Sequence, residues 1–336
     1  HVEDRIKKAM GVMGQMWEIG KRRFGGDWGR RMKLFEWLVE SVIAFGAEIW
    51  GWKEWDKIER LQERYIRWVL GVDGRTPGYM VREEGKRDKM RTRIGRRAVS
   101  YEEKLERGEG SEWARKCWEE VKRRGEEGDS NWEKQRRSFY EERGVSVEWV
   151  RRQREEGEEW RGRIEERDIE VQQQERFERV QKSRWNRWYR EIRVLGVPRY
   201  LREKGKEESM TRVARFRLGS EMRGGRYWER EEKRLCRICE GAQETWEHVV
   251  EICMREEEEG GREKILEILD ENGKGEGWMK RLQKRREEGK TEAEKGRGRG
   301  GETETETERR DETETSMSGR EWRGMEDVRE RERDEE

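Results

Sequence analysis

Hydrophobic residues recur at three- and four-residue steps along much of the chain, which is the spacing of amphipathic helices. The densest pattern lies in 30–50 and predicts the most apolar helix of the protein. A second helix is predicted over about 55–70, and a glycine-rich turn at 71–78 ends it. With a further helical pattern at the start, these elements make 1–107 a small helical subdomain with its own core.

Beyond this subdomain the apolar positions are sparse among charges. Short helices are predicted first, one of which begins at Ser130 with the Ser-x-x-Glu form of a capping box. From 146 to about 192 the pattern predicts a long exposed helix, or two with a kink near Gly157. We therefore expect 108–192 to be a charged helical spacer. Its charged positions favour a face exposed to solvent over a helix that binds a partner.

The last third divides by composition into three parts. Residues 193–260 hold a predicted basic helix near 208–222 and all but one of the cysteines, and 261–289 predicts short helices. Residues 290–336 consist of Gly-Arg and Glu-Thr repeats with almost nothing to bury, so we expect disorder there. The predicted fold class is mainly α, with a small cysteine-rich knuckle and a disordered C-terminal tail.

Composition limits the size of any core. Only 30% of the residues are hydrophobic and 47% are charged, which favours solvated helices and small local cores. The sequence has no run of eighteen apolar residues and no signal-peptide pattern, so we expect a soluble, intracellular protein with no membrane partner.

The net charge of +1 hides an uneven distribution. Residues 181–237 carry eighteen Lys and Arg against eight Asp and Glu, a net of +10, whereas 254–336 carry a net of −8. The positive block ends at the first pair of clustered cysteines. A phosphate backbone is the partner that such a block suits.

Three of the four cysteines and one of the two histidines fall in one short window. Cys236 and Cys239 are separated by two residues; His248 follows after eight more and Cys253 after a further four. A Cys3His set of this spacing closes a tetrahedral zinc site, with donor atoms within about 4 Å of one another. Because the set is closed, we expect one Zn²⁺ with a structural role; the alternative is a chance cluster of buried thiols.

The fourth cysteine, Cys117, stands apart from this window and argues against a disulfide framework. Its simplest interpretation is a small apolar residue on a helix face, and a reactive thiol is the less favoured one.

Within the basic block, several residues are candidates for contact with nucleic acid. Trp185, Trp188 and Tyr189 alternate with basic residues, a pattern that suits either stacking on bases or anchoring of a helix. Trp246 is likewise either a stacking residue or a hydrophobic plug under the metal loop. The candidate phosphate ligands are arginines on the basic helix and around the knuckle: Arg212, Arg215, Arg217, Arg223, Arg226 and Arg237.

Two stretches of the chain resemble a known family. Arg215–Met222, Arg226–Glu229, the Cys-x-x-Cys pair and Glu244–His248 are similar to the C-terminal region of non-LTR retrotransposon reverse transcriptases of the insect type. Ser41–Gly51, Glu59–Gln62, Leu70–Gly71 and Thr76–Pro77 resemble the helices that follow the polymerase palm in that family. The resemblance covers roughly 1–107 and 181–255, and the chain departs from the family pattern at Glu240, where glycine is common, and at Val250, where tryptophan is common.

The resemblance implies a role in handling nucleic acid. In this family the first region takes the place of a thumb, which grips the template–primer duplex, and the knuckle is thought to hold nucleic acid. A helix hairpin that only packs would explain the apolar residues of 1–107 equally well. Because the chain begins with histidine inside a helical pattern, we expect a fragment of a longer reading frame. The resemblance further implies RNA or DNA as the partner and a nuclear location.

Several enzymatic motifs are missing from the sequence. It contains no aromatic-x-Asp-Asp motif of the kind that holds polymerase metal ions, no P-loop and no G-x-S-x-G motif. We therefore expect no catalysis by this fragment and no small-molecule substrate. The function we expect is accessory to target-primed reverse transcription. The alternatives are a zinc-stabilised module that docks a protein partner, and an inactive product of a decayed element.

Overall fold

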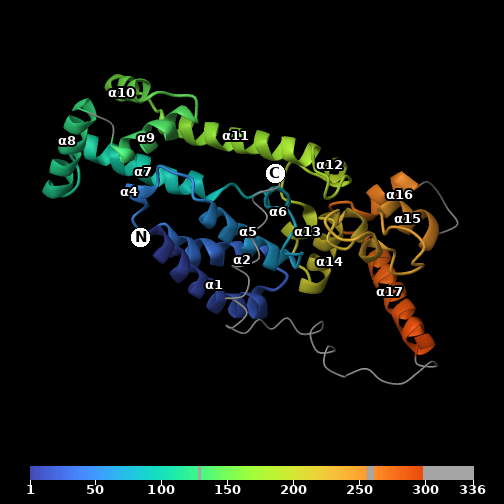
Figure 1. Cartoon of the computed structure of the whole chain (residues 1–336). Helices are drawn as coiled ribbons and strands as arrows, with labels where there is room; N and C mark the ends of the chain where they lie inside the picture. Colours follow the sequence, from blue (N-terminus) through green and yellow to red (C-terminus); the bar gives the residue numbers. More distant parts are fainter. Residues whose placement is uncertain (128–129, 256–260, 298–336) are drawn as a thin grey trace. The chain divides into compact units, whose positions relative to one another are not determined.

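The computed structural model describes residues 1–127, 130–255 and 261–297 (Figure 1). Within these residues the regular elements are helices, and no strand is formed. The nearest approach to a sheet is a single antiparallel bridge between Leu235 and Gln243. The prediction of a mainly α protein is therefore confirmed.

The first region folds into a bundle of helices, and part of its apolar interior, at Trp52, Ala98 and Val99, is shared with side chains of the middle region. Its elements are α1 (Val2–Phe24), α2 (Trp28–Leu34), a π-helical turn (Phe35–Glu40), α3 (Ser41–Ile43), α4 (Ala47–Trp50), α5 (Asp56–Leu70), α6 (Gly78–Gly85) and α7 (Met90–Glu106).

The most apolar predicted helix, 30–50, is interrupted. The chain turns at 44–46, where Gly46 has a φ of 75°, a value that favours glycine. The turn rotates α4 relative to α2 and α3. Phe45 and Ile49, which lie in this apolar pattern, are exposed.

The second predicted helix is confirmed as α5, which ends at Gly71 in the left-handed region with a φ of 62°. It packs against α1, α6, α7 and α14, and its buried face carries Tyr65. There the ring of Tyr65 stacks on Phe35 at 4.9 Å, and its hydroxyl donates to the carbonyl of Arg31 at 2.7 Å. A buried hydroxyl is satisfied in this way, so the aromatic core carries no unpaired donor at this point.

The middle of the chain is helical as predicted, but one of its faces is buried. Its elements are α8 (Glu112–Glu127), α9 (Asn131–Glu141), α10 (Val147–Glu156), α11 (Arg161–Gln181) and α12 (Tyr189–Ile192). The side chain of Ser130 accepts from the backbone N–H of Glu133, which confirms the predicted cap. Gly157, with a φ of 73°, separates α10 from α11.

The exposure predicted for the spacer is wrong for one side of α11, which packs on α6 and α7. Asp168 on that side is buried, accepts a hydrogen bond from Thr92 at 2.7 Å, and pairs with Arg91 and Arg143 at 3.0 Å. Polar residues can line an interface when each finds a partner, and sparse apolar spacing does not reveal such an interface.

The last region is built from short elements. They are α13 (Arg199–Arg202), α14 (Glu207–Arg217), two 3-10 turns (Arg223–Gly225 and Glu231–Arg234), α15 (Trp246–His248), a π-helical turn (Val249–Cys253), α16 (Gly261–Ile268) and α17 (Glu276–Arg297). The predicted basic helix is α14 and ends earlier than expected. Helix α17 continues to Arg297, into the tail predicted to be disordered, and the rest of that prediction, 298–336, lies outside the described residues.

Residues 1–289 form one compact unit, and 290–336 form a second of which only the helical start is described. The subdivision predicted within 1–289 stays a prediction. No helix in the described part of the chain is both long and apolar enough to cross a membrane.

A buried carboxylate links the first region of this unit to its last region. Glu84, at the end of α6, is 1% exposed and accepts from the Nε of Arg217 on α14 at 2.6 Å. The hydroxyls of Tyr200 and Tyr189 donate to the same carboxylate at 2.8 and 2.9 Å. Burial alone would raise the pKa of Glu84, but the charge of Arg217 and these hydrogen bonds lower it below 4.5.

We expect Glu84→Gln to lower the free energy of unfolding at neutral pH by roughly 3–5 kcal/mol, because it leaves the buried Arg217 guanidinium without a counter-charge. Since the folded-state pKa is depressed, the stabilisation is present above pH 4.5 and is lost as the pH falls through the folded pKa. Urea unfolding at pH 7 and at lower pH measures this. The difference in the free energy of unfolding between variant and wild type should become smaller in acid.

The matched control is Glu203→Gln, which removes an exposed partner of Arg199; both side chains of this pair are more than half exposed. We expect a loss below about 1 kcal/mol there. Equal losses for the two variants would contradict a special role for the buried pair.

Candidate metal centre

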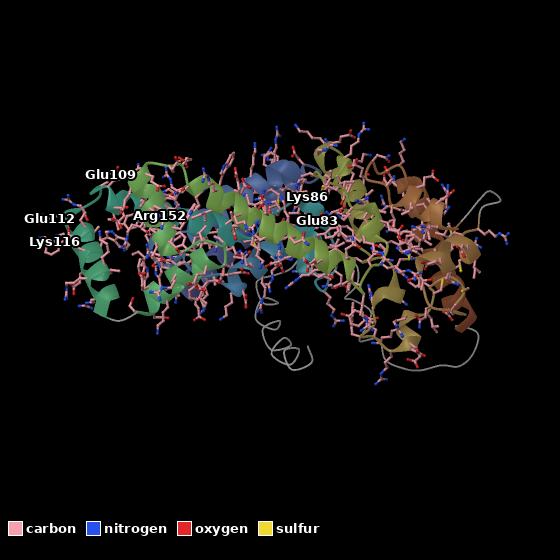
Figure 2. All side chains as sticks on the ribbon, turned by 90° about the horizontal axis from the view of Figure 1, so that it is seen from above. Glu83, Lys86, Glu109, Glu112, Lys116 and Arg152 are labelled. Atoms are coloured by element: carbon pink, nitrogen blue, oxygen red, sulfur yellow. The ribbon has the colours of Figure 1, made fainter. Side chains whose placement is uncertain are left out.

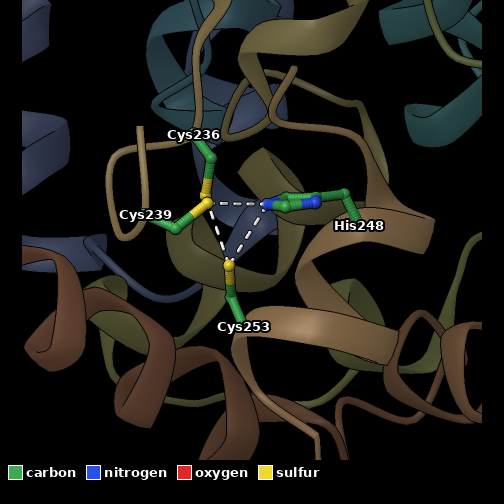
Figure 3. Close-up of side chains that lie close together, drawn as sticks. All are labelled: Cys236, Cys239, His248 and Cys253. Carbon is green, nitrogen blue, oxygen red and sulfur yellow. Dashed lines mark hydrogen bonds between the residues drawn. The ribbon is translucent and has the colours of Figure 1, made fainter. Parts of the chain in front are cut away.

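The four predicted ligands lie on two short segments that face each other. Cys236 and Cys239 sit on a tight loop, in which the backbone N–H of Glu240 donates to the carbonyl of Cys236 at 2.9 Å. His248 ends α15, whose first turn is capped by the hydroxyl of Thr245, and Cys253 ends the following π-helical turn. Loop and helix thereby direct all four side chains to one point (Figure 3).

The donor atoms are close enough to surround one ion. The Sγ atoms of Cys236 and Cys253 are 3.7 Å apart, and the Nε2 of His248 lies 3.1 Å from Cys239 Sγ and 3.2 Å from Cys253 Sγ. All four donors lie within 4.8 Å of one another, a slightly looser set than the predicted 4 Å. Tetrahedral zinc with Zn–S of about 2.3 Å requires S···S distances of about 3.8 Å. The cluster can thus hold one metal ion such as zinc.

The electrostatics of the cluster suit a cation. Burial alone would raise the pKa of the Cys239 thiol, but hydrogen bonds with the Gly241 backbone, the other two thiols and His248 lower it to about 7. Burial and the neighbouring thiols raise the pKa of Cys253. The hydrogen bonds around Cys239 thus favour its thiolate, the form that ligates metals.

A second buried carboxylate supports the loop. Glu244, which is fully buried, lies between the two ligand pairs and accepts from the Nη2 of Arg237 at 2.9 Å. Arg286 of α17 approaches the same carboxylate at 3.1 Å. Burial and the neighbouring charge of Arg237 lower the pKa of Arg286 to about 10. Sequence reasoning missed Glu244 and Arg286, because a pairing between a loop and a later helix leaves no local pattern.

Trp246 is buried at 4% exposure, and its ring packs against Phe216 at 5.8 Å and Trp278 at 6.0 Å. Of its two predicted roles, the structure agrees with the hydrophobic plug. A base cannot stack on a ring that other side chains of the protein already cover. The predicted role of Trp246 as a stacking residue is therefore replaced by that of a hydrophobic plug.

The predicted phosphate ligands are mostly engaged inside the protein. Arg217 is fully buried against Glu84, which corrects its assignment as a nucleic-acid contact. Arg237 is held by Glu244, and Arg212 pairs with Glu276 at 2.7 Å.

The other three predicted arginines lie nearer the surface. Arg226 is partly buried and contacts Glu229 at 3.5 Å, and Arg223 is partly buried beside Arg237 and Glu244. Arg215 is the one exposed member of the six, and its Nε donates to the carbonyl of Gly71.

In the alternating pattern at 182–190, the aromatic side chains are buried and the basic side chains are exposed. Trp185, Trp188 and Tyr189 are buried, so their role is to anchor the chain. Arg184 and Arg190, which flank these aromatic residues, are exposed, as are Arg230 and Lys233 before the ligand loop, and these four have no acidic partner within the described part of the chain. Arg187, which lies between them, pairs with Glu247. The alternation of basic and aromatic residues was the sequence signal for Arg184 and Arg190, but neither residue was assigned a role from it.

No protein-family model, curated protein or solved structure matches this chain.

We expect the purified chain to retain one metal ion and Cys239→Ser to retain none, because three donors cannot close the tetrahedral set. Elemental analysis after purification in zinc-containing buffer measures this. Cys117→Ser is the matched control, since Cys117 lies exposed on α8, outside the cluster, and should leave the metal content unchanged. Equal metal content in both variants would exclude the assigned site.

Glu240 holds a left-handed backbone conformation, with a φ of 54°, that is costly for a residue with a side chain. We expect Glu240→Gly to raise the free energy of unfolding by roughly 0.5–1 kcal/mol in the metal-loaded chain, after allowance for the greater freedom of glycine when unfolded. Chemical denaturation checks the sign. The control Glu232→Gly, in a 3-10 turn with ordinary backbone angles, should lower it instead. A destabilised Glu240→Gly would show that the Glu240 side chain has another role.

Proposed function

We propose that this chain is the C-terminal part of a non-LTR retrotransposon reverse transcriptase, and that it binds RNA or DNA as an accessory to target-primed reverse transcription. The resemblance of 1–107 and 181–255 to that family supports the proposal. The observation that carries it is the convergence of Cys236, Cys239, His248 and Cys253 in a part of the chain whose preceding segments hold exposed cations without acidic partners among the described residues.

In this proposal the metal is a single Zn²⁺ with a structural role. All four donors come from the protein, so the set leaves no position for a substrate or an activated water. The ion would fix the loop that carries Cys236 and Cys239 against α15. The chain itself supplies no polymerase activity, since the sequence lacks the paired carboxylates that the reaction requires. A nuclear location follows from the proposed role.

The nucleic-acid surface we propose differs from the predicted arginine set. Its members are cations that are exposed and lack acidic partners within the described residues, namely Arg184, Arg190, Arg230 and Lys233. Arg215 is exposed as well, but its Nη1 lies 4.0 Å from Glu221. Cations already paired inside the protein gain little from a phosphate, because the existing partner must first be given up. Free guanidiniums release counterions from the nucleic acid at no such cost.

We expect the full chain to bind single-stranded oligonucleotides with an affinity that falls steeply as salt rises. Replacing Arg184, Arg190 and Arg230 together by alanine should reduce the slope of log K against log salt by about two to three units, about one for each phosphate contact. Fluorescence anisotropy across 50–300 mM salt is the measurement.

The matched control replaces Lys104, Arg151 and Arg152, three exposed cations of the helices remote from the knuckle, and changes the net charge equally. Figure 2 labels Arg152, which lies on α10 and not on the elements that carry the four ligands. The control slope should stay that of the wild type. Binding that is flat with salt, or equally weakened in both triple variants, would favour a module that docks a protein partner.

A further inference from the structure

Tyr227 is an exposed aromatic residue on a rigid support, in the segment that leads into the ligand loop. Its side chain is 56% exposed, and its ring meets Trp228 edge to face at 5.0 Å. Trp228 in turn stacks on Trp185 with ring centroids 4.9 Å apart and planes 10° apart. The indole N–H of Trp185 donates to the carbonyl of Leu218 at 2.7 Å, which fixes the stack to the end of α14.

The backbone before Tyr227 is as constrained as the rings. Gly225 approaches Trp185 so closely that a Cβ at this position would lie 2.4 Å from the Trp185 carbonyl oxygen. The backbone N–H of Tyr227 donates to the carbonyl of Gly225 at 3.0 Å. An exposed ring that is held in place loses little side-chain entropy when it binds a flat partner.

Free positive charge surrounds these rings. The guanidinium of Arg184 lies over one face of the Tyr227 ring, 5.3 Å from its centroid, and that of Arg75 lies over the Trp228 ring, 5.6 Å from its centroid. Both side chains are exposed, and neither has an acidic partner among the residues that the structure describes. Three segments distant in the sequence thus bring rings and unpaired cations to one surface.

A second exposed aromatic residue shows what is particular to this surface. Trp113 on α8 is 76% exposed, with the ammonium of Lys116 at 5.4 Å. However, Lys116 is paired with Glu112 at 2.7 Å. A single exposed tryptophan is ordinary on a protein surface, whereas a supported ring with unpaired guanidiniums matches the chemistry of a base and its phosphates.

We propose that Tyr227 stacks on an unpaired base of a nucleic-acid strand, while Arg184 and Arg75 meet its flanking phosphates. The proposal rests on the nucleic-acid binding proposed above and makes it specific for single strands. The bases of a duplex are stacked on each other and do not present a face to a side chain. Tyr227 takes the role that sequence analysis considered for the buried Trp246.

The test uses the full chain with zinc and the variants Tyr227→Leu, Tyr227→Phe and Trp113→Leu. The probes are a fluorescein-labelled twelve-nucleotide oligoadenylate as RNA and as DNA, the same DNA with abasic sites, and its duplex. We expect Tyr227→Leu to weaken binding of both single strands by about 5- to 150-fold, with an unchanged salt slope. Tyr227→Phe and Trp113→Leu should bind like the wild type.

Two further arms separate stacking from a general loss of structure. Duplex binding by Tyr227→Leu should stay within about twofold of wild type, and the abasic strand should bind the wild type as weakly as the intact strand binds the variant. Zinc content and helicity should be those of the wild type.

Three outcomes would overturn the proposal. Equal binding by Tyr227→Leu and wild type, with the arginine triple variant still weakened, would remove stacking and leave the nucleic-acid function standing. An absence of binding to every probe at 50 mM salt would refute both. Loss of a concentration-dependent self-association in Tyr227→Leu, measured by sedimentation, would make this surface a contact between copies of the chain.

Discussion

The ion pair between Glu84 and Arg217 is the constraint on which the arrangement of 1–289 depends. It joins two helices 133 residues apart in the sequence, and both side chains are essentially fully buried. Two buried charges are expensive to remove from water, so the pair is tolerated only where further donors and acceptors complete it. Tyr189 and Tyr200 supply donors to Glu84, and the carbonyls of Ile192 and Leu269 accept from Arg217. Every one of these groups must be in register at once, which specifies one packing of the C-terminal helices on α6.

The same solution recurs elsewhere in the chain. Glu102, 2% exposed, accepts from Arg136 at 2.8 Å and Arg154 at 2.7 Å, and Glu244 takes the corresponding place under the metal loop. A sequence that is 47% charged and 30% hydrophobic cannot enclose 289 residues with apolar side chains alone. It does so by placing paired charges between small apolar clusters. Composition correctly predicted that the chain has few apolar residues to bury. It did not predict that ion pairs would be buried between the apolar clusters.

Local sequence signals predicted local structure. The periodicity of α5 and the cap at Ser130 depend on residues within one or two turns of each other, and the four clustered ligands fall in one window of 18 residues; the structure shows each of them. The break at Gly46 did not follow from periodicity, because glycine in an apolar run marks a left-handed turn only where the surrounding packing requires one. The partners of Arg217 and Arg286 lie far away along the chain, so no local pattern could have identified them.

For Arg217 the spacing itself contained part of the answer. Met210, Val213, Ala214 and Arg217 follow the steps of one buried helical face, whereas Arg215 lies two residues from Arg217 and on another side. Treating the arginines of α14 as one surface overlooked this geometry. A helix presents residues three or four apart together, so an arginine in step with the apolar residues points inward and must have a buried partner.

The position of Glu244 connects the metal site to the surface proposed to bind nucleic acid. Glu244 lies in the chain between Cys239 and His248, and its carbonyl accepts from the backbone N–H of Gly224 at 2.9 Å. A Cβ on Gly224 would lie 2.8 Å from that carbonyl oxygen, so the backbone segments at Gly224 and Glu244 are in close contact. Tyr227 follows three residues later. An ion bound by the four ligands would hold Glu244 in place, and Glu244 holds the backbone that carries Tyr227. Metal binding would therefore help to order the ring that we propose to stack on a base, with no contact between the ion and the ring.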